Sequence, residues 1–172
     1  MRLVPMKVEV ARPTRDASAL PRPRPPAPMK TGVSVPADPY QRAQLYLALG
    51  FGSSAQKVLQ ANLKAIGDHY DYWILRAQSA YLARALTDAR DAAKMAATKA
   101  TTPQQKGTAT WWQGRIALKR RDFPLAIRFL QQATQQLPRT IGVWLDLVDV
   151  CLHTKKTTLL GKVLTRAEKV LP

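Results

Sequence analysis

The stretch GTATWWQGRIALKRRDFPLAIRFLQQATQQLPRTIGVWLDLVDVCLHTKKTTLLGKVLTRAEKVLP, residues Gly107–Pro172, contains one pattern twice. Three pairs of identical residues stand at the same separation in it: Pro138 and Pro172, Ala133 and Ala167, and Leu130 and Leu164. Each copy ends at a proline, which stops a helix because it has no backbone N–H to donate. Apolar residues recur in each copy with the period of a helix. The stretch therefore predicts two consecutive helical hairpins.

Related residues continue this pattern toward the N-terminus. Counting back from the first copy by an interval slightly longer than that between Pro138 and Pro172 reaches a matching set of residues, most of them small. They are Trp73, Ala77, Ala89, Ala93 and Ala96. A further step of the original length reaches Ala43, Tyr46, Ala55 and Leu59. The additional residues of the longer step fall in a loop around Thr101-Thr102-Pro103. The sequence thus predicts four units, near residues 36–69, 70–106, 107–140 and 141–172.

Residues 36–172 resemble the tetratricopeptide repeat, a 34-residue helix-turn-helix unit with Trp, Leu and Tyr in its first helix and a closing Pro. Trp144 and Pro172 match this pattern in the last unit, and Arg121–Ile127 resembles the usual turn and helix start. Cys151 departs from it, because it stands at the position of the larger Tyr. The resemblance implies an all-α, right-handed α-solenoid of about four repeats whose first helices line a concave groove. A generic helical bundle is the alternative.

Residues 1–35 have a different composition, centred on Pro21-Arg22-Pro23-Arg24-Pro25-Pro26-Ala27-Pro28. Proline at this density removes backbone donors and biases each preceding residue toward extended geometry. An extended or disordered leader is therefore expected. One interpretation is a solvated linker. The other is a docking element, in which the basic strip Arg22, Pro23, Arg24, Pro25 and Pro26 binds a partner in a preorganised extended conformation.

The chain is strongly basic, with 27 Lys and Arg against 11 Asp and Glu and a formal net charge of +16. Seven basic and two acidic residues precede Pro36, so most of the excess lies on the predicted repeats. Such a charge favours an acidic protein, nucleic-acid phosphate or an anionic surface as partner, and it also favours solubility. The densest basic patch is Lys119, Arg120 and Arg121, extended by Arg128, where a phosphate or an acidic peptide would bind.

The sequence offers only coarse indications of the compartment. A single cysteine, Cys151, forms no internal disulfide and is compatible with a reducing environment. No run approaches the length of a membrane-spanning apolar segment, so we expect no membrane-spanning helix. Residues 1–10 lack the apolar core of a secretory signal. A cytoplasmic location is expected, with a mitochondrial location or the periplasmic side of an envelope complex as alternatives.

No set of residues predicts catalysis, a cofactor or a metal. His69 and His153 each lack a second ligand at metal-binding spacing, and Cys151 is expected to be a small core residue. Gly50-Phe51-Gly52 lacks the third glycine of a phosphate-binding loop. We therefore expect a protein that is not an enzyme and that needs no cofactor.

The resemblance to the repeat family also implies which side chains line the groove. They are the residues at the matching positions of the first helices: Tyr40, Gln44, Ile74, Gln78, Tyr81, Trp111, Arg115, Lys119, Leu145 and Asp149. Aromatic rings beside amides and fixed cations suit an extended peptide with an acidic or apolar anchor.

The function that these observations favour is that of a non-enzymatic scaffold, adaptor or chaperone. It would hold a segment of a partner protein in the groove, as part of a larger assembly such as secretion or pilus machinery. A second copy or another partner is expected to cover Val163, Leu164 and Val170-Leu171 of the last repeat. The alternative is a basic structural protein associated with RNA or a ribonucleoprotein particle, in which the charge carries the function.

Overall fold

The computed structural model describes residues 35–171, so the predicted docking strip Arg22–Pro26 lies outside the described residues. The described part of the chain is all-α and contains no strand, which confirms the predicted all-α class. Its helices are α1 Pro39–Ala48, α2 Gly52–Ala61, α3 Leu63–Ile66, α4 Tyr70–Leu82, α5 Leu86–Lys99, α6 Pro103–Lys119, α7 Phe123–Gln136, α8 Ile141–His153 and α9 Thr157–Val170.

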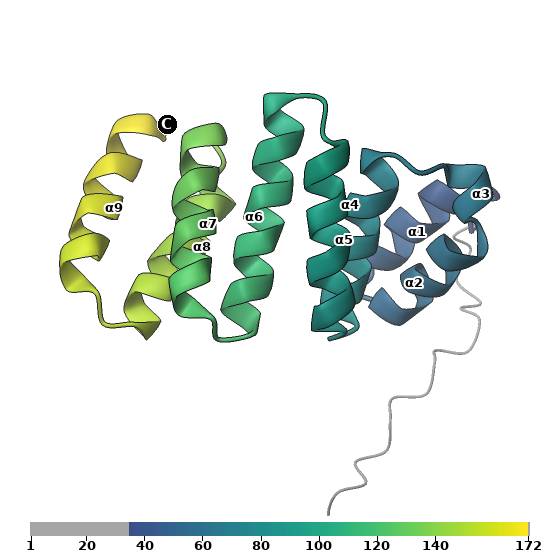
Figure 1. The fold of residues 1–172 in the computed structure, drawn as a ribbon, viewed down its shortest axis with the longest axis horizontal. Helices are drawn as coiled ribbons and strands as arrows, with labels where there is room; N and C mark the ends of the chain where they lie inside the picture. The colour runs from purple at the N-terminus through teal and green to yellow at the C-terminus, as the bar shows by residue number, and fades with distance from the viewer. Residues whose placement is uncertain (1–34, 172) are drawn as a thin grey trace, which may run out of the picture. The chain divides into compact units, whose positions relative to one another are not determined.

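Consecutive helices form four antiparallel pairs: α1 with α2, α4 with α5, α6 with α7, and α8 with α9 (Figure 1). The second helix of each pair also packs on the first helix of the next pair. The first helices contact one another as well, α1 with α4, α4 with α6, and α6 with α8. Side chains from three successive first helices are thereby brought onto one face.

The short turn inside each pair has the same backbone hydrogen bonds in all four pairs. In the second pair the Arg84 N–H donates to the Tyr81 carbonyl at 3.1 Å, and the Ala85 N–H donates to the Ala80 carbonyl at 2.9 Å. This is the Schellman ending of a helix, whose central residue adopts a left-handed conformation. The residues at that position are Gly50 (φ 78°), Arg84 (φ 60°), Arg121 (φ 62°) and Lys155 (φ 53°). Gly50 and Arg84, and likewise Arg121 and Lys155, are separated by the same interval as Pro138 and Pro172. Arg84 and Arg121 are separated by the longer interval that includes the loop around Thr101-Thr102-Pro103.

Side-chain caps define several helix starts. Asp38 followed by Pro39 predicts the start of α1, and the Asp38 carboxylate accepts the Gln41 N–H at 3.0 Å as the cap of this helix. Thr102 caps α6 in a reciprocal arrangement: its hydroxyl accepts the Gln105 N–H at 3.1 Å, while its own N–H donates to the Gln105 side chain at 3.2 Å. Helix α6 therefore begins at Pro103, as the pair Thr102-Pro103 predicts for the start of the third helix pair, one helical turn before the approximate unit boundary at Gly107.

The apolar residues Val58, Leu59 and Leu63 predict one continuous helix over Ser54–Ile66, and the first pair differs from that prediction. Helix α2 ends at Ala61, and the short α3 follows as a separate element. Asn62 breaks the helix with φ of −120°, and its side-chain amide donates to the Val58 carbonyl at 2.8 Å. Asparagine favours such breaks because its side chain competes for nearby backbone groups.

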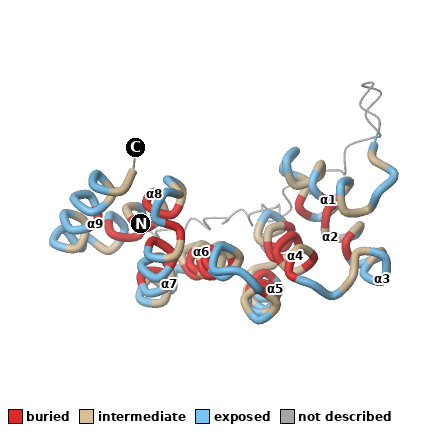
Figure 2. Tube along the Cα trace, turned by 90° about the horizontal axis from the view of Figure 1, so that it is seen from above, coloured by how far each residue is buried: buried red, intermediate tan, exposed pale blue. Residues whose placement is uncertain are grey.

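Buried residues lie along the facing sides of the helices (Figure 2). Alanines dominate between α4 and α5, where Ala77, Ala80, Ala89 and Ala93 are completely buried. Small side chains let two helices approach closely, so this pair packs through its backbones more than through large side chains.

Larger side chains fill the core at the C-terminal end. Trp144 and Leu147 are 3% and 1% exposed, and Cys151 packs in the same cluster at 1%. The burial of Cys151 confirms the prediction that it is a core residue. Val163 is also buried, at 5%, because it packs into this cluster, so the expectation that it is exposed is wrong. Leu164 is 46% exposed, as expected.

The left-handed turns lead to a first prediction. An L residue with a side chain is strained in this conformation by about 1–2 kcal/mol relative to glycine. We expect Arg84→Gly to raise the free energy of unfolding by about 1 kcal/mol, measured by urea denaturation. Lys94→Gly, in the middle of α5, is the matched control and should lower the free energy by about 1 kcal/mol. A loss of stability in Arg84→Gly would show that the Arg84 side chain itself stabilises the turn.

A second prediction concerns a close approach between α6 and α7 at Gly114. A Cβ atom on Gly114 would lie 2.8 Å from Cγ of the buried Leu130, whereas a Cβ atom on Gly161 of α9 would meet nothing within 4 Å. Overpacking costs about 1–3 kcal/mol, which outweighs the gain in helix propensity. Gly114→Ala should therefore lower the melting temperature and Gly161→Ala should raise it. Equal shifts in both variants would contradict the packing argument.

Candidate partner-binding site

Arg115 of α6 is surrounded by three aromatic rings. Its guanidinium carbon lies 4.5 Å from the ring centre of Trp112, 5.3 Å from that of Tyr81 and 5.5 Å from that of Trp111. A cation over the face of an aromatic ring is attracted by the negative charge of that face. The Tyr81 ring also meets the Trp112 ring edge-on, with centres 5.6 Å apart. Side chains of α4 and α6 thus hold the guanidinium in one place.

Asp146 of α8 contacts both Trp111 and Arg115 of this cluster. Its Oδ2 accepts a hydrogen bond from Trp111 Nε1 at 2.6 Å and lies 3.4 Å from Arg115 Nε. Burial raises the pKa of the Asp146 carboxyl, although the hydrogen bond from Trp111 and the charge of Arg115 act in the opposite direction. The carboxylate is therefore a partly desolvated acceptor beside a fixed cation.

An open hollow of about 560 Å³ lies beside this cluster. Its lining comes from α4, α6, α7 and α8 and from the α6–α7 turn: Tyr81, Leu118, Lys119, Arg121, Phe123, Asp146, Asp149 and His153. Lys119 Nζ lies 5.9 Å from the centre of the Tyr81 ring, and His153 Nε2 lies 3.5 Å from Asp149 Oδ1. The rings of Phe123 and His153 are stacked, with centres 6.0 Å apart. The hollow thus combines charges of both signs with accessible rings.

The structure brings together five of the ten groove residues that the sequence predicts: Tyr81, Trp111, Arg115, Lys119 and Asp149. Leu145 projects from α8 and is 62% exposed. Tyr40 lines a separate hollow near the start of α4, Gln44 is exposed on α1, and Gln78 is half-buried on α4. Ile74 is only 7% exposed and packs with Tyr70 and Ala109, so it cannot contact a partner.

Two residues of the cluster are absent from that predicted set. Trp112 precedes Asp146 by the same step that separates Pro138 from Pro172, and both therefore occupy the same position in successive first helices. Asp146 and Asp149 are also the only acidic side chains of α8, and the other residues of this helix except His153 are apolar. A carboxylate within an otherwise apolar helix is the sequence signal that could have indicated a polar contact for Asp146.

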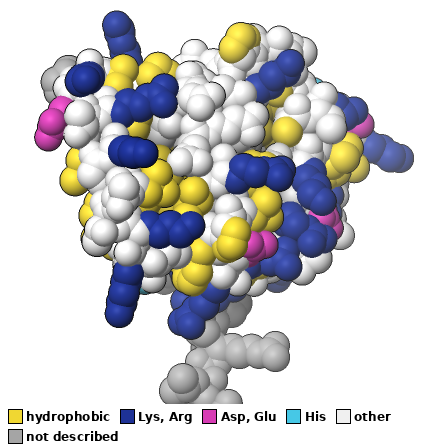
Figure 3. Space-filling model, turned by 60° about the vertical axis from the view of Figure 1, so that its left-hand side comes forward, with side chains coloured by type: hydrophobic (Ala, Val, Ile, Leu, Met, Phe, Trp, Pro, Cys, Tyr) yellow, Lys and Arg dark blue, Asp and Glu magenta, His cyan; other side chains and the backbone are white. Residues whose placement is uncertain are grey.

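The predicted basic patch lies next to the hollow. Lys119, Arg120 and Arg121 are exposed at the turn between α6 and α7, and the Arg128 guanidinium lies 5.5 Å from the centre of its neighbouring Phe129 ring. Figure 3 shows Lys and Arg side chains spread over the face that carries the C-terminal helices, with apolar atoms between them.

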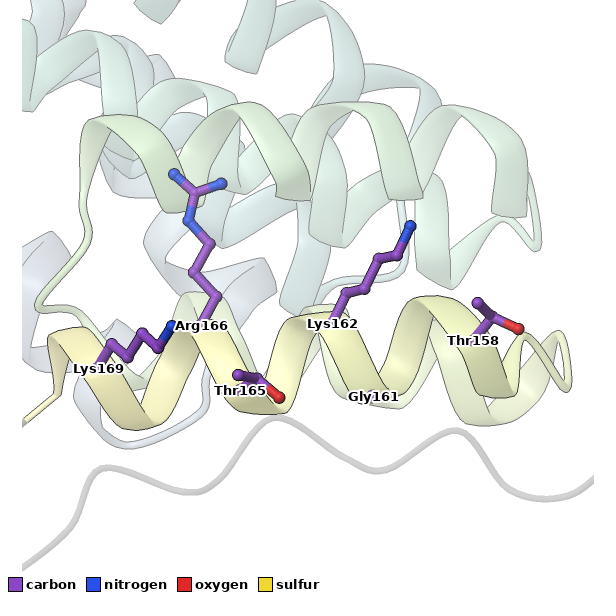
Figure 4. Close-up of a pocket in the computed structure, with 6 residues that line it drawn as sticks. All are labelled: Thr158, Gly161, Lys162, Thr165, Arg166 and Lys169. Carbon is purple, nitrogen blue, oxygen red and sulfur yellow. The ribbon is translucent and has the colours of Figure 1, made fainter.

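Two further surfaces carry positive charge. One is a hollow of about 330 Å³ between α5, α6 and α7, where Arg90, Lys94 and Arg120 surround apolar side chains that include Phe129. The other is a shallow face of α9, formed by Thr158, Gly161, Lys162, Thr165, Arg166 and Lys169 (Figure 4). Neither surface contains a residue that the sequence predicted for the groove.

Within residues 35–171, no three His, Cys, Asp or Glu side chains are placed to hold a metal ion. Across that same range, every helix is too short or too polar to cross a membrane. No protein-family model matches the chain, and no curated protein matches it.

The raised pKa of Asp146 leads to a prediction on pH dependence. The folded state binds this proton more tightly than the unfolded chain, so protonation stabilises the fold. The quantity to measure is the free energy of unfolding of the wild type minus that of Asp146→Asn. This difference should rise as the pH falls from neutral, through the raised pKa of Asp146, toward the ordinary carboxyl pKa of 3.8. Urea denaturation at a series of pH values measures this difference. A difference that falls with decreasing pH would mean that Arg115, and not burial, controls the carboxyl group.

Proposed function

We propose that residues 36–172 form a right-handed, tetratricopeptide-like α-solenoid that acts as a non-enzymatic scaffold for a partner protein. The support for this fold is the same Schellman turn in four pairs, at the separations found in the sequence. Contacts between successive first helices give further support, because they form a continuous inner face. The groove on that face would hold an extended segment of the partner.

The observation that carries this proposal is the cluster of Arg115 with Tyr81, Trp111, Trp112 and Asp146. Three of its side chains are aromatic, and their rings are only half-buried. Fixed aromatic and Arg side chains dominate binding energy at protein interfaces, because they offer a large contact area and lose little entropy on binding. This cluster spans α4, α6 and α8, and an extended peptide that crosses the three helices would contact all of it.

The charges beside the cluster indicate what such a peptide contains. Lys119 is exposed and lies next to the Tyr81 ring, where it can pair with a carboxylate of the partner. Leu145, on the next first helix, offers an exposed apolar contact. The proposed partner segment therefore has an acidic residue close to an apolar one.

Selection of a displayed random peptide library on the purified protein tests this proposal. Peptides that carry an acidic residue near a large apolar residue should be enriched, and fluorescence anisotropy should give their dissociation constants. Lys119→Glu should weaken their binding by about tenfold or more, equivalent to about 1.4 kcal/mol. Lys57→Glu, which makes the same charge change on the exposed side of α2, is the matched control.

Equal weakening in the two variants would show that only the overall charge attracts the peptides. If the peptides bind both variants as tightly as they bind the wild type, their binding site lies elsewhere on the protein. Either result would reject the groove as the binding site.

A further inference from the structure

The turns inside the second, third and fourth helix pairs lie along one edge of the helical part, because each pair reverses the chain at the same end (Figure 1). These turns carry six cations that are far apart in the sequence: Arg84, Lys119, Arg120, Arg121, Lys155 and Lys156. All six side chains are exposed. We name these six residues the basic edge.

The cations of the basic edge take no part in the ion pairs that residues 35–171 form. Five acidic residues lie nearby. Asp122 caps α7 by accepting the Leu125 N–H at 3.3 Å, Asp91 pairs with Arg90 at 2.9 Å, and Asp88 lies in the first turn of α5. Asp146 and Asp149 line the hollow beside Lys119 and Arg121, where they lie next to Arg115 and His153. Four of the five carboxylates thus have partners outside the basic edge, and the edge keeps a positive excess.

The backbone indicates that this charge is not required by the fold. Arg84, Arg121 and Lys155 hold the left-handed position that Gly50 occupies in the first turn, where glycine would be free of strain. The first helices end at this edge and the second helices begin there, so their opposite dipoles largely cancel. Neither backbone geometry nor helix dipoles therefore favour a cation at three successive turns.

Aromatic rings adjoin the basic edge. Lys119 and Arg121 line the hollow that also contains Tyr81 and the stacked pair of Phe123 and His153. The His153 side chain is 59% exposed, so one face of this stack is open to a ligand. Cations along a line with rings beside them are the combination by which proteins bind single-stranded nucleic acid, with phosphates on the cations and bases on the rings.

We propose that the basic edge and the adjoining rings bind single-stranded nucleic acid. Phosphates contact the cations of successive turns, and a base stacks on His153 and Phe123. Asp149, which is half exposed in the same hollow, accepts hydrogen bonds from the amino group of a base. This binding goes beyond the peptide groove, and it would let the scaffold hold a protein segment and a nucleic-acid strand together.

Two other polyanionic partners fit these residues less well. An anionic bilayer would favour a continuous apolar surface beside the cations. Leu82 and Leu152 are exposed at 43% and 59%, but they belong to different turns and stand singly. An acidic protein segment would use the cations but would leave the open face of the Phe123–His153 stack without a role.

The test measures the binding of a fluorescein-labelled 20-nucleotide oligocytidylate, whose bases carry the amino group that Asp149 would accept from, to the full chain by fluorescence anisotropy at several salt concentrations. The triple variant Arg84→Gln, Arg120→Gln and Lys155→Gln removes one cation from each turn and leaves the lining of the hollow intact. Its affinity should fall at least about tenfold, and its plot of log affinity against log salt should be shallower by about 2, because each phosphate contact contributes about 0.7 to the slope. His153→Ala should weaken binding about tenfold through lost stacking, with an unchanged slope.

The matched control is Lys57→Gln, Lys64→Gln and Lys106→Gln, which removes the same net charge from exposed positions away from the basic edge. Its affinity should stay within about threefold of the wild type. Equal losses in the two triple variants would overturn the proposal, because binding would then depend only on total charge. Binding to phosphatidylglycerol vesicles or polyglutamate, without binding to the oligonucleotide, would overturn it in favour of a membrane or an acidic protein.

Peptide binding in the groove, measured on the same basic-edge variant, should be unchanged. Failure of either proposal can therefore be recognised separately.

Discussion

The left-handed turn residue is the constraint on which the rest of the helical part depends. At Gly50, Arg84, Arg121 and Lys155 one positive φ lets the first helix end and the second begin within a few residues. The paired hydrogen bonds of the Schellman ending satisfy carbonyl groups that would otherwise lack partners. Because the same turn recurs at nearly constant spacing, each pair meets the next through equivalent faces.

This regularity places the candidate site. Successive first helices contact one another, so side chains from α4, α6 and α8 meet at Arg115, although Tyr81 and Asp146 lie far apart in the sequence. The rings lie around the guanidinium, and the Asp146 carboxylate contacts both Arg115 and Trp111. A cluster of this kind is already ordered before a partner binds, which reduces the entropy lost on binding.

The same regularity explains why charge gathers at one edge. Basic residues are spread along the chain, but those in three of the four turns reach one side, because each turn lies at the same end of its helix pair. The peptide groove and the basic edge meet at Lys119 and Arg121, which line the hollow between them. The two proposed binding sites are therefore adjacent and use largely different residues.

Local patterns in the sequence predict the all-α class, the caps at Asp38 and Thr102 and the burial of Cys151, because helix periods, caps and small apolar residues depend on neighbouring residues. The sequence could not show that Asn62 ends α2, since an isolated asparagine is also tolerated inside helices. It placed Ile74 in the groove, whereas packing against α5 and α6 buries it. The packing of the helix pairs brings Trp112 and Asp146 to Arg115 and places Arg84 and Lys155 on one edge with Arg121. These groupings arise from contacts between helix pairs, and no local pattern of residues encodes them.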